Sequence, residues 1–599
     1  MQGKDSTEEN RRMYNLQDDA SRKKKRERIF TVLFLFCSFC ALMIFAFYVN
    51  RHIHIKALYM DDLYLFSFFR EQDFFTFSFP IGNAVRFRPV YWALSYIEMV
   101  FVGNDPNRYW YFNVALNGLL ACFLCYFSWV VSKGKKLIPL FLSVVFLSAH
   151  FAYYQIAQAL GILETLALGF SLLTLYFLYQ ELNEEKHFLR NLALSHLFFF
   201  LLVFTHERYI ALLPLFYVPL LFRGRAGKAK ILTGGKNEGH QGHFFTSHLP
   251  YILPLAQAFL FYAIRKFAIG SFVPKGTGGT EVSESFKLGE ALQNAFAEVY
   301  YIFGFQKGPE HLNGIPWEKV SPDMRKLVYA SIAVLAFTVM LCLIFALVRI
   351  FKTEKSAGRN AGSSMESGSG SNIENSIENS TENSTGKKAT KDLVNNSVSD
   401  SVNNLRKDQK REKLARLRSF IGNNILFLLF IALCIGSSSV TIRVEMRWVY
   451  VSFAASLLYF SYLLGVSRLP LGTIFCLAFI CLRLPVERYY RSYFPQIYFW
   501  EDQDRMNSLA EQTIEKYGRG GVLGKQVYIL ENKYKMSKFY GDTFFQVFDE
   551  DFSGHGTKIH FIQDLTRLPK DANRKNSLVL EEVPEQRAYR DITGEVFHE

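Results

Sequence analysis

Residues 22–49 read RKKKRERIFTVLFLFCSFCALMIFAFYV, a basic cluster followed directly by an unbroken apolar run over 29–49. The apolar run has the length that a helix needs to cross a bilayer. No small-residue cleavage site follows it, so we interpret it as an uncleaved signal anchor. Because Lys and Arg are retained on the cytoplasmic side of membranes, the basic cluster predicts that residues 1–28 are cytoplasmic.

The composition of the whole chain indicates the same class of protein. Of 599 residues, 50% are hydrophobic and 16% are aromatic, which is too apolar for an ordinary soluble protein. The net charge of +14 fits basic cytoplasmic loops better than nucleic-acid binding. The eight cysteines all lie within apolar runs, so they predict neither disulfides nor a metal site. The predicted fold class is a polytopic α-helical membrane protein.

Further apolar segments follow along the chain, and several of them are short. Together with 29–49 they predict about eleven transmembrane helices. We expect a membrane domain over residues 29–351 and C-terminal transmembrane helices over 419–485. The further predicted spans are 109–131, 137–154, 158–179, 189–204, 209–222, 249–269, 326–350, 420–436, 447–464 and 469–485.

The segment 89–102 decides the predicted topology. It is aromatic and apolar, but it is short for a span and contains Glu98. We therefore interpret it as an interfacial helix within a first outer loop of residues 50–108. With this choice nearly every dense basic cluster falls on the inner side, as the positive-inside rule requires. The sequence thus predicts a plasma-membrane protein with a cytoplasmic N-terminus and an extracytoplasmic C-terminus.

Two long regions are expected to lie outside the membrane. Residues 352–418 are rich in Ser, Asn and Gly, a composition that predicts a disordered cytoplasmic linker. Residues 486–599 are soluble in character, and 527–530 and 559–562 have the composition of short strands. We expect 486–599 to form a small extracytoplasmic α/β domain.

The predicted topology gathers unusual polar clusters on the outer face. They lie in the first outer loop, between two short spans, and just before the span at 447–464. A further outer loop, 270–323, is preceded by Arg265 and Lys266, which mildly oppose the topology. The candidate site residues are Asp61, Asp62, Arg86, Arg88, His206, Glu207, Arg208, Arg443, Glu445 and Arg447.

Each cluster also has a purely structural interpretation. The acidic pair could be a solvated turn, and residues 206–208 could equally form a salt-bridged turn between helices. Residues 443–447 could anchor the chain at the membrane interface beside Trp448. Glu164, inside a predicted span, is either a functional acid or a hydrogen-bonded residue of the bundle.

The residue types in these clusters suit one kind of chemistry. Arginine matches phosphate oxygens through its planar fork of donors, and an Asp can accept the proton of a hydroxyl nucleophile. Together they predict inverting sugar transfer from a polyprenyl-phosphate donor to a hydroxyl acceptor. Two carboxylates are compatible with a divalent cation but do not by themselves predict a metal site. No Gly-rich phosphate loop indicates a nucleotide site.

The order of these features resembles the GT-C superfamily of polytopic glycosyltransferases. The resemblance rests on the first span, Asp61-Asp62, then Arg88-Pro89 and residues 103–108 before the next span. It implies that Asp61 is the general base and Asp62 its helper. It also implies a bacterial cell envelope, with a polysaccharide, glycolipid or protein as acceptor. The long inner linker departs from the family pattern, and residues 206–208 match no family position.

Two other classes of function stay open. A polysaccharide polymerase or ligase also uses lipid-linked glycans and outer-loop arginines. A transporter or flippase would show broken helices or an inverted repeat, and the sequence has no clear repeat. The single-site hypothesis requires that Asp61 and Arg447 meet in one pocket.

Overall fold

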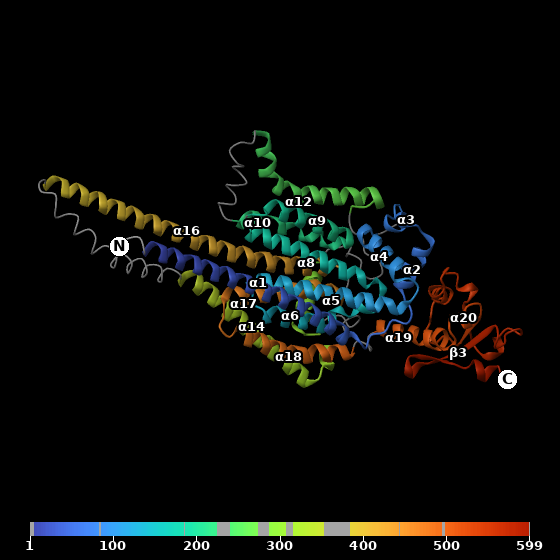
Figure 1. Ribbon diagram of the computed structural model, residues 1–599. Coiled ribbons are helices and arrows are strands. Elements are labelled where there is room, and N and C mark those ends of the chain that lie inside the picture. Colours follow the sequence, from blue (N-terminus) through green and yellow to red (C-terminus); the bar gives the residue numbers. More distant parts are fainter. Residues whose placement is uncertain are drawn as a thin grey trace.

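This computed structural model describes residues 5–82, 86–184, 186–223, 240–272, 287–306, 315–352, 384–441, 444–493 and 498–597. Long helices run side by side in a bundle (Figure 1). The N-terminus lies toward one end of the bundle, and a small domain that holds the C-terminus lies at the other. The two ends of the bundle therefore differ in structure.

The bundle is that of a multi-pass membrane protein. Eight helices in the described part of the chain are long and apolar enough to cross a membrane, or nine if the bent pair α6 and α7 forms one span. The pair bends by 53° at its break. The long helices are α1 (Asp5–Asn50), α5 (Pro106–Val131), α8 (Ile162–Asn183), α9 (Phe188–Thr205), α12 (His240–Ile269), α14 (Pro322–Lys352), α16 (Ser384–Ser439) and α17 (Val449–Ser467), and the bent pair is α6 (Leu137–Ser148) and α7 (Tyr153–Ala157).

Two predicted spans form helices that are not long and apolar enough by the same measure. The segment predicted at 209–222 is divided into the 3-10 helix η3 (Glu207–Phe216) and α10 (Tyr217–Phe222), with Pro214 inside η3. The segment predicted at 469–485 belongs to α18 (Gly472–Tyr493), whose second half carries several charged residues. Both pack within the bundle, η3 and α10 against α16, and α18 against α14.

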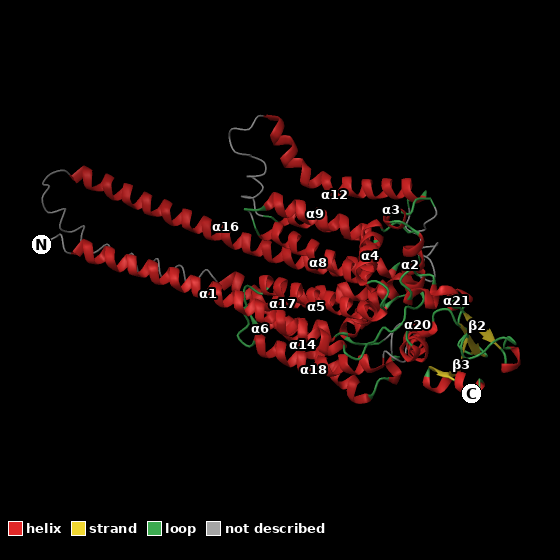
Figure 2. Ribbon diagram, turned by 45° about the vertical axis from the view of Figure 1, so that its right-hand side comes forward, coloured by secondary structure: helices red, strands yellow, loops and turns green. Residues whose placement is uncertain are grey.

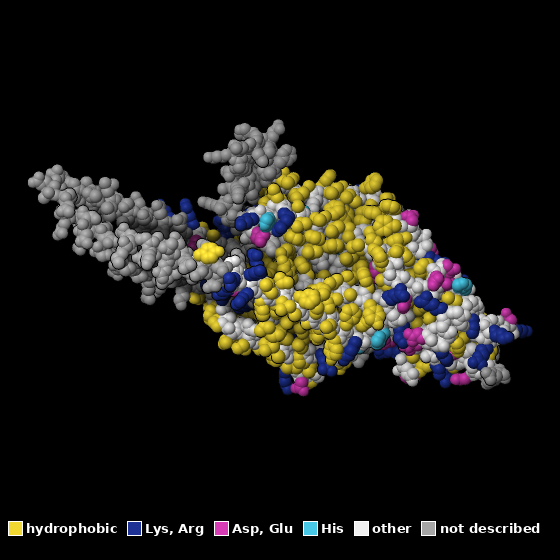
Figure 3. Space-filling view, in the orientation of Figure 1, with side chains coloured by type: hydrophobic (Ala, Val, Ile, Leu, Met, Phe, Trp, Pro, Cys, Tyr) yellow, Lys and Arg dark blue, Asp and Glu magenta, His cyan; other side chains and the backbone are white. Residues whose placement is uncertain are grey.

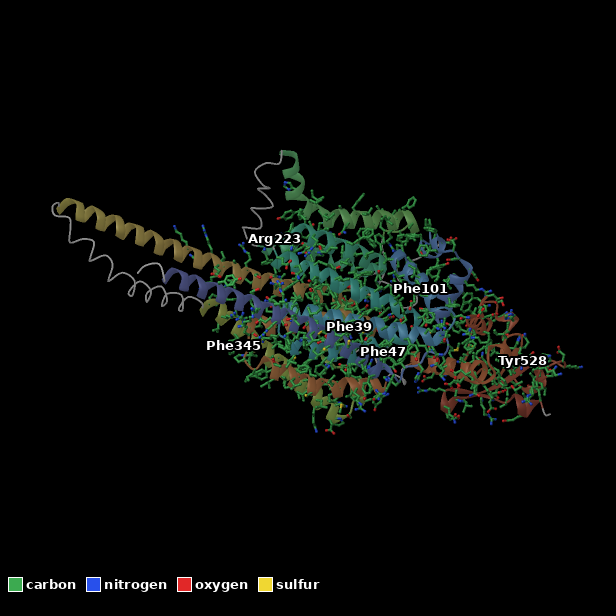
Figure 4. The ribbon with its side chains drawn as sticks, viewed as in Figure 1. Phe39, Phe47, Phe101, Arg223, Phe345 and Tyr528 are labelled. Carbon is green, nitrogen blue, oxygen red and sulfur yellow. The ribbon has the colours of Figure 1, made fainter. Side chains whose placement is uncertain are left out.

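The bundle surface is apolar where lipid would contact it. A broad hydrophobic band covers the middle of the bundle, and charged side chains gather toward its two ends (Figure 3). Phe39 of α1 and Phe345 of α14, each 41% exposed, lie along this bundle (Figure 4). Exposed rings of this kind are stable in a hydrocarbon environment but would be costly in water.

The predicted linker is only partly described. Residues 353–383 lie outside the described residues, and the part from Ser384 onward belongs to α16, which continues to Ser439 as one helix. In Figure 1, α16 extends beyond the bundle at the end where the N-terminus lies.

Residues 50–108, the predicted first outer loop, include three short helices, α2 (Asp61–Glu71), α3 (Phe74–Ser78) and α4 (Pro89–Val102). Asp73 caps α3 by accepting the backbone N–H groups of Phe75 and Thr76. Pro89 starts α4, where its missing N–H has no cost, and Gly103 ends it at a φ of 75°. The helix predicted at 89–102 is therefore present, and it is too short to span.

The C-terminal domain is built around a four-stranded mixed sheet of order β2-β1-β3-β4. The central strand β1 (Gln526–Leu530) pairs in parallel with β2 (Ile559–Ile562) and β3 (Ser577–Val583), and β3 pairs antiparallel with β4 (Ala588–Asp591). This confirms the predicted α/β character and both predicted strands (Figure 2). Its helices are α19 (Tyr498–Ala510), α20 (Arg519–Val522), α21 (Lys538–Thr543) and α22 (Thr593–Val596), with a π-helical turn at Glu511–Glu515.

The C-terminal domain and the predicted first outer loop share one hydrophobic core. Leu63 and Phe66 of α2 belong to the same buried cluster as Val527 of β1 and Phe548. Polar contacts add to it, since Lys56 forms ion pairs of 2.7 and 2.9 Å with Glu511 and Glu515. The domain is thus docked on the loop that carries the acidic pair.

Candidate active site

One cavity of about 630 Å³ brings together residues from three of the predicted polar clusters. Asp61 and Arg447 both line it, as the single-site hypothesis requires. The predicted site residues that line the cavity are Asp61, Arg86, Arg88, His206, Glu207, Arg208 and Arg447. Their segments are far apart in the sequence, so the bundle itself creates the cavity.

Helix α2 brings the first acid into the cavity. Asp61, Tyr64, Leu65 and Phe68 recur at the three- and four-residue spacing of one helix face, and all four line the cavity. Asp61 is exposed and is the first residue of α2, where the helix dipole stabilises a carboxylate. This position leaves the Asp61 carboxylate accessible from the cavity.

Asp62 occupies a different environment from Asp61. Its side chain is 1% exposed and accepts the backbone N–H of Ala159 at 3.1 Å. It does not belong to the residues that line the cavity. Asp62 therefore holds α2 against the turn before α8, and the two neighbouring acids have separate surroundings.

The segment before α4 supplies two arginines. A hydrogen bond holds this segment in place, since the backbone N–H of Phe87 donates to Glu207 Oε1 at 2.6 Å. Burial, and next the charge of Arg86, lower the pKa of Arg88 to about 10. Burial also lowers the pKa of Arg86, followed by the charge of Arg447. These shifts are those of guanidinium groups crowded together away from water.

Arg88 also has a donor that the protein leaves unused. Its Nε is buried and has no hydrogen-bond partner among the described residues. A buried charged donor of this kind is costly unless something else binds it.

Residues 206–208 lie where α9 ends and η3 begins, and Glu207 and Arg208 form ion pairs with two different helices. Glu207 Oε2 pairs at 2.5 Å with Arg265 of α12, which is fully buried. Arg208 pairs with Glu164 of α8 at 3.0 Å, and its Nε and Nη1 have no partner among the described residues. Burial, and next Arg88, hold the pKa of His206 well below its usual range, so its imidazole is neutral.

The last cluster is only partly described. Arg447 pairs with the buried Glu445, and its guanidinium lies over the Tyr154 ring at 4.5 Å from the centroid. Glu445 therefore orients Arg447 rather than lining the cavity. Arg443 lies outside the described residues.

The charges that line the cavity do not cancel. Among the described residues that line it, four are arginines and two are acids, Asp61 and Glu207. Glu207 is paired with Arg265, while Glu164 and Glu445 lie behind Arg208 and Arg447. Counted with these partners, five arginines stand beside four carboxylates, Asp61 included, so the site has one positive charge in excess next to one accessible carboxylate.

The rest of the cavity wall is largely apolar or small. Ile210 and Ala211 of η3 face the cavity together with Leu433, Gly436 and Val440 near the end of α16. All of them belong to helices of the bundle except Val440, which directly follows α16. The cavity thus combines a cationic part with an apolar wall on its bundle side.

Three residues of the site were not predicted, or were predicted only as alternatives. Tyr154, under Arg447, gave no signal because an aromatic residue in an apolar helix is common. Glu164 was considered for either a functional or a structural role, and it bonds to Arg208 within the bundle. Arg265 opposed the predicted topology as a basic outer residue, and its ion pair with Glu207 explains its position.

One group in the described chain could hold a metal ion, and it lies away from the cavity. Asp549, Asp551 and His555 of the C-terminal domain place one ligand atom each within 4.8 Å of one another. His555 Nδ1 lies 2.6 Å from Asp549 Oδ2, so these two side chains are already in contact with each other.

The fold defines a multi-pass helical membrane protein with a docked α/β domain. No family model, curated protein or solved structure matches the chain. The resemblance in motif order to GT-C enzymes therefore stays a prediction from sequence.

Proposed function

We propose that the protein is an inverting membrane glycosyltransferase that moves a sugar from a polyprenyl-phosphate donor to a cell-envelope acceptor on the outer face of the membrane. The observation that carries the proposal is the combination in one cavity of an exposed carboxylate, Asp61, with an excess of arginines and an apolar wall. The arginines and the apolar wall suit the phosphate and the tail of a lipid donor. The carboxylate suits a hydroxyl nucleophile, whose proton it can accept.

In this proposal the arginines bind the phosphate of the donor. Arg88 and Arg208 offer buried N–H groups that lack partners within the described residues. A phosphate oxygen would satisfy these donors and offset the cost of keeping them dry. The tail of the bound lipid would extend along the apolar wall near Leu433, which belongs to the bundle.

Asp61 then acts on the acceptor. Its carboxylate takes the proton of the acceptor hydroxyl while the hydroxyl oxygen bonds to the anomeric carbon of the donor. The bond between that carbon and the phosphate oxygen breaks, and the lipid phosphate leaves with its charge stabilised by the arginines. Attack opposite the leaving group inverts the configuration at the anomeric carbon.

The test is sugar transfer in membranes that contain wild-type protein, Asp61→Asn or Asp73→Asn at matched amounts. Radiolabelled polyprenyl-phosphate sugars would be supplied as a mixture, with delipidated cell-envelope material as acceptor. Asp73 is an exposed acid of the same loop that caps α3 outside the cavity, and Asn also caps helices. We expect Asp61→Asn to lose about 10²–10⁴-fold in transfer, and Asp73→Asn to retain it.

Two results would contradict the proposal. Wild-type transfer that survives in Asp61→Asn would remove the assigned base. Wild-type protein that transfers none of the supplied sugars, while it moves or polymerises a lipid-linked glycan in the same membranes, would assign the cavity to a different class of protein.

A further inference from the structure

Tyr64 and Phe68 of α2, which line the cavity, adjoin Phe539 and Tyr540 of α21, and these four residues are called the aromatic rim. Tyr64 and Phe68 both line the cavity and are 43% and 47% exposed. The Phe539 ring stacks on Tyr64 with centroids 4.1 Å apart and planes 7° from parallel. Tyr540 meets Tyr64 edge-on at 6.2 Å. Two parts of the chain that are far apart in sequence thus build one rim.

Docking of the C-terminal domain does not depend on these partly exposed rings alone. Phe552 packs edge-on against Phe66 of α2, with centroids 5.0 Å apart, next to the shared core. Lys56 is held by two carboxylates of the domain, and its backbone N–H donates to Asn507 at 2.8 Å. The rim rings of α21 pack against the shared core as well, so the rim is one of several contacts that attach the domain.

We propose that the aromatic rim binds a sugar ring of the acceptor, so that the C-terminal domain forms the acceptor side of the cavity. The inference rests on the proposed function and specifies its second substrate as a carbohydrate. The electron-rich face of an aromatic ring attracts the weakly positive C–H groups that line one face of a pyranose. Aromatic side chains also present this surface at little cost in conformational entropy.

The position of the rim relative to Asp61 supports a sugar ring rather than a lipid. Tyr64 follows Asp61 by three residues on the same face of α2, which separates their Cβ atoms by roughly 5–6 Å. That separation is close to the width of one pyranose, so a sugar on Tyr64 would present a hydroxyl to Asp61. The apolar wall that suits a lipid tail comes from other elements, η3 and the end of α16.

The experiment uses detergent-solubilised full-length protein and the delipidated carbohydrate fraction of the cell envelope as the probe. Binding of this fraction is measured on a biosensor, and the KM for it is measured in the transfer assay. We expect Phe539→Ala to weaken binding and raise that KM about five- to tenfold, with kcat little changed, because one aromatic contact is lost. Phe539→Tyr keeps the ring and should bind as wild type does.

Two control variants separate sugar binding from attachment of the domain. Lys56→Ala removes the ion pairs to Glu511 and Glu515 but leaves the rim rings in place. Leu565→Ala removes an exposed apolar side chain of the same domain that does not belong to the rim. Both should bind the carbohydrate fraction as wild type does.

Three results would overturn the inference. One is a loss of binding in Lys56→Ala as large as that in Phe539→Ala. Another is a lower kcat with unchanged KM in Phe539→Ala. Either result would mean that the rim only packs the domain against α2. The third is a wild-type protein that does not bind the carbohydrate fraction. Carbohydrate binding that depends on Phe539 without transfer from any donor would uphold the rim and refute the proposed transfer.

Discussion

Two of the groups of charged side chains that are buried in the described part of the bundle differ in whether their guanidinium donors have partners. The closed cluster consists of His150, Gln306, Arg483 and Glu487. Glu487 accepts from His150 Nδ1 and from Arg483, both at 2.6 Å, and Gln306 Nε2 lies 3.0 Å from His150 Nε2. The cavity beside Arg483 measures only about 50 Å³ and is lined mainly by apolar residues.

The cavity cluster, which consists of Asp61, Arg86, Arg88, Arg208 and Arg447, has the opposite character. It surrounds about 630 Å³, and two of its guanidinium groups retain buried donors without partners among the described residues. The comparison teaches that buried charge does not identify a site by itself. A site is indicated by buried donors without partners that lie next to open space, because a ligand there can supply the missing hydrogen bonds.

The sharpest way to break this comparison is Glu487→Ala in the closed cluster. The change leaves Arg483 and His150 buried without their shared acid, so we expect a loss of about 3–5 kcal/mol in stability. Thermal unfolding of the solubilised protein measures it, with Glu184→Ala at an exposed position as control. A variant as stable as wild type would show that the closed cluster is not structural.

Arg88→Met tests the cavity cluster in the opposite sense. We expect transfer to fall by about 10²–10³-fold, because one donor to the leaving phosphate is lost. Stability should hold or rise, since the variant removes a buried guanidinium whose Nε is unsatisfied. A loss of stability as large as that of Glu487→Ala would mean that Arg88 is a structural residue.

Glu164→Gln tests whether Glu164, behind the cavity, and Arg208, which lines it, stabilise the protein as a coupled pair. Arg208 would lose its charged partner at 3.0 Å, and we expect a cost of about 1–3 kcal/mol in unfolding free energy. Combining Glu164→Gln with Arg208→Met should cost less than the sum of the two single variants. Additive losses in the thermal unfolding of the three variants would contradict a coupled pair.

The smallest effect concerns pH. Burial keeps the pKa of His206 well below 6.5, so the unfolded chain binds a proton near that pH that the folded chain does not. Stability should be full above pH 6.5 and fall as the pH drops below it, by at most about 1.4 kcal/mol per pH unit from this residue. His206→Gln should remove that part of the slope in unfolding midpoints measured from pH 7 to 5. An unchanged slope would show that His206 is protonated in the folded state.

Several features of the fold followed from sequence because they depend on local physics. The apolar run at 29–49 is long enough to span by itself, and the brevity of 89–102 excluded it as a span. The apolar, β-branched stretches at 527–530 and 559–562 favoured strands in any context. Segments 209–222 and 469–485 were harder to predict, since prolines divide the helix of one and charged residues make the helix of the other less apolar than a span requires.

For the site, the sequence by itself determined the residue types, namely an acidic pair and several arginines expected on one face of a membrane protein. Only the tertiary structure decided which of them share a cavity. Asp61 and Asp62 are neighbours, yet helix geometry turns one into the cavity and the other toward Ala159. Glu207 and Arg265 form an ion pair because η3 and α12 pack together. Such pairings depend on how distant helices meet, and no local pattern in the chain encodes them.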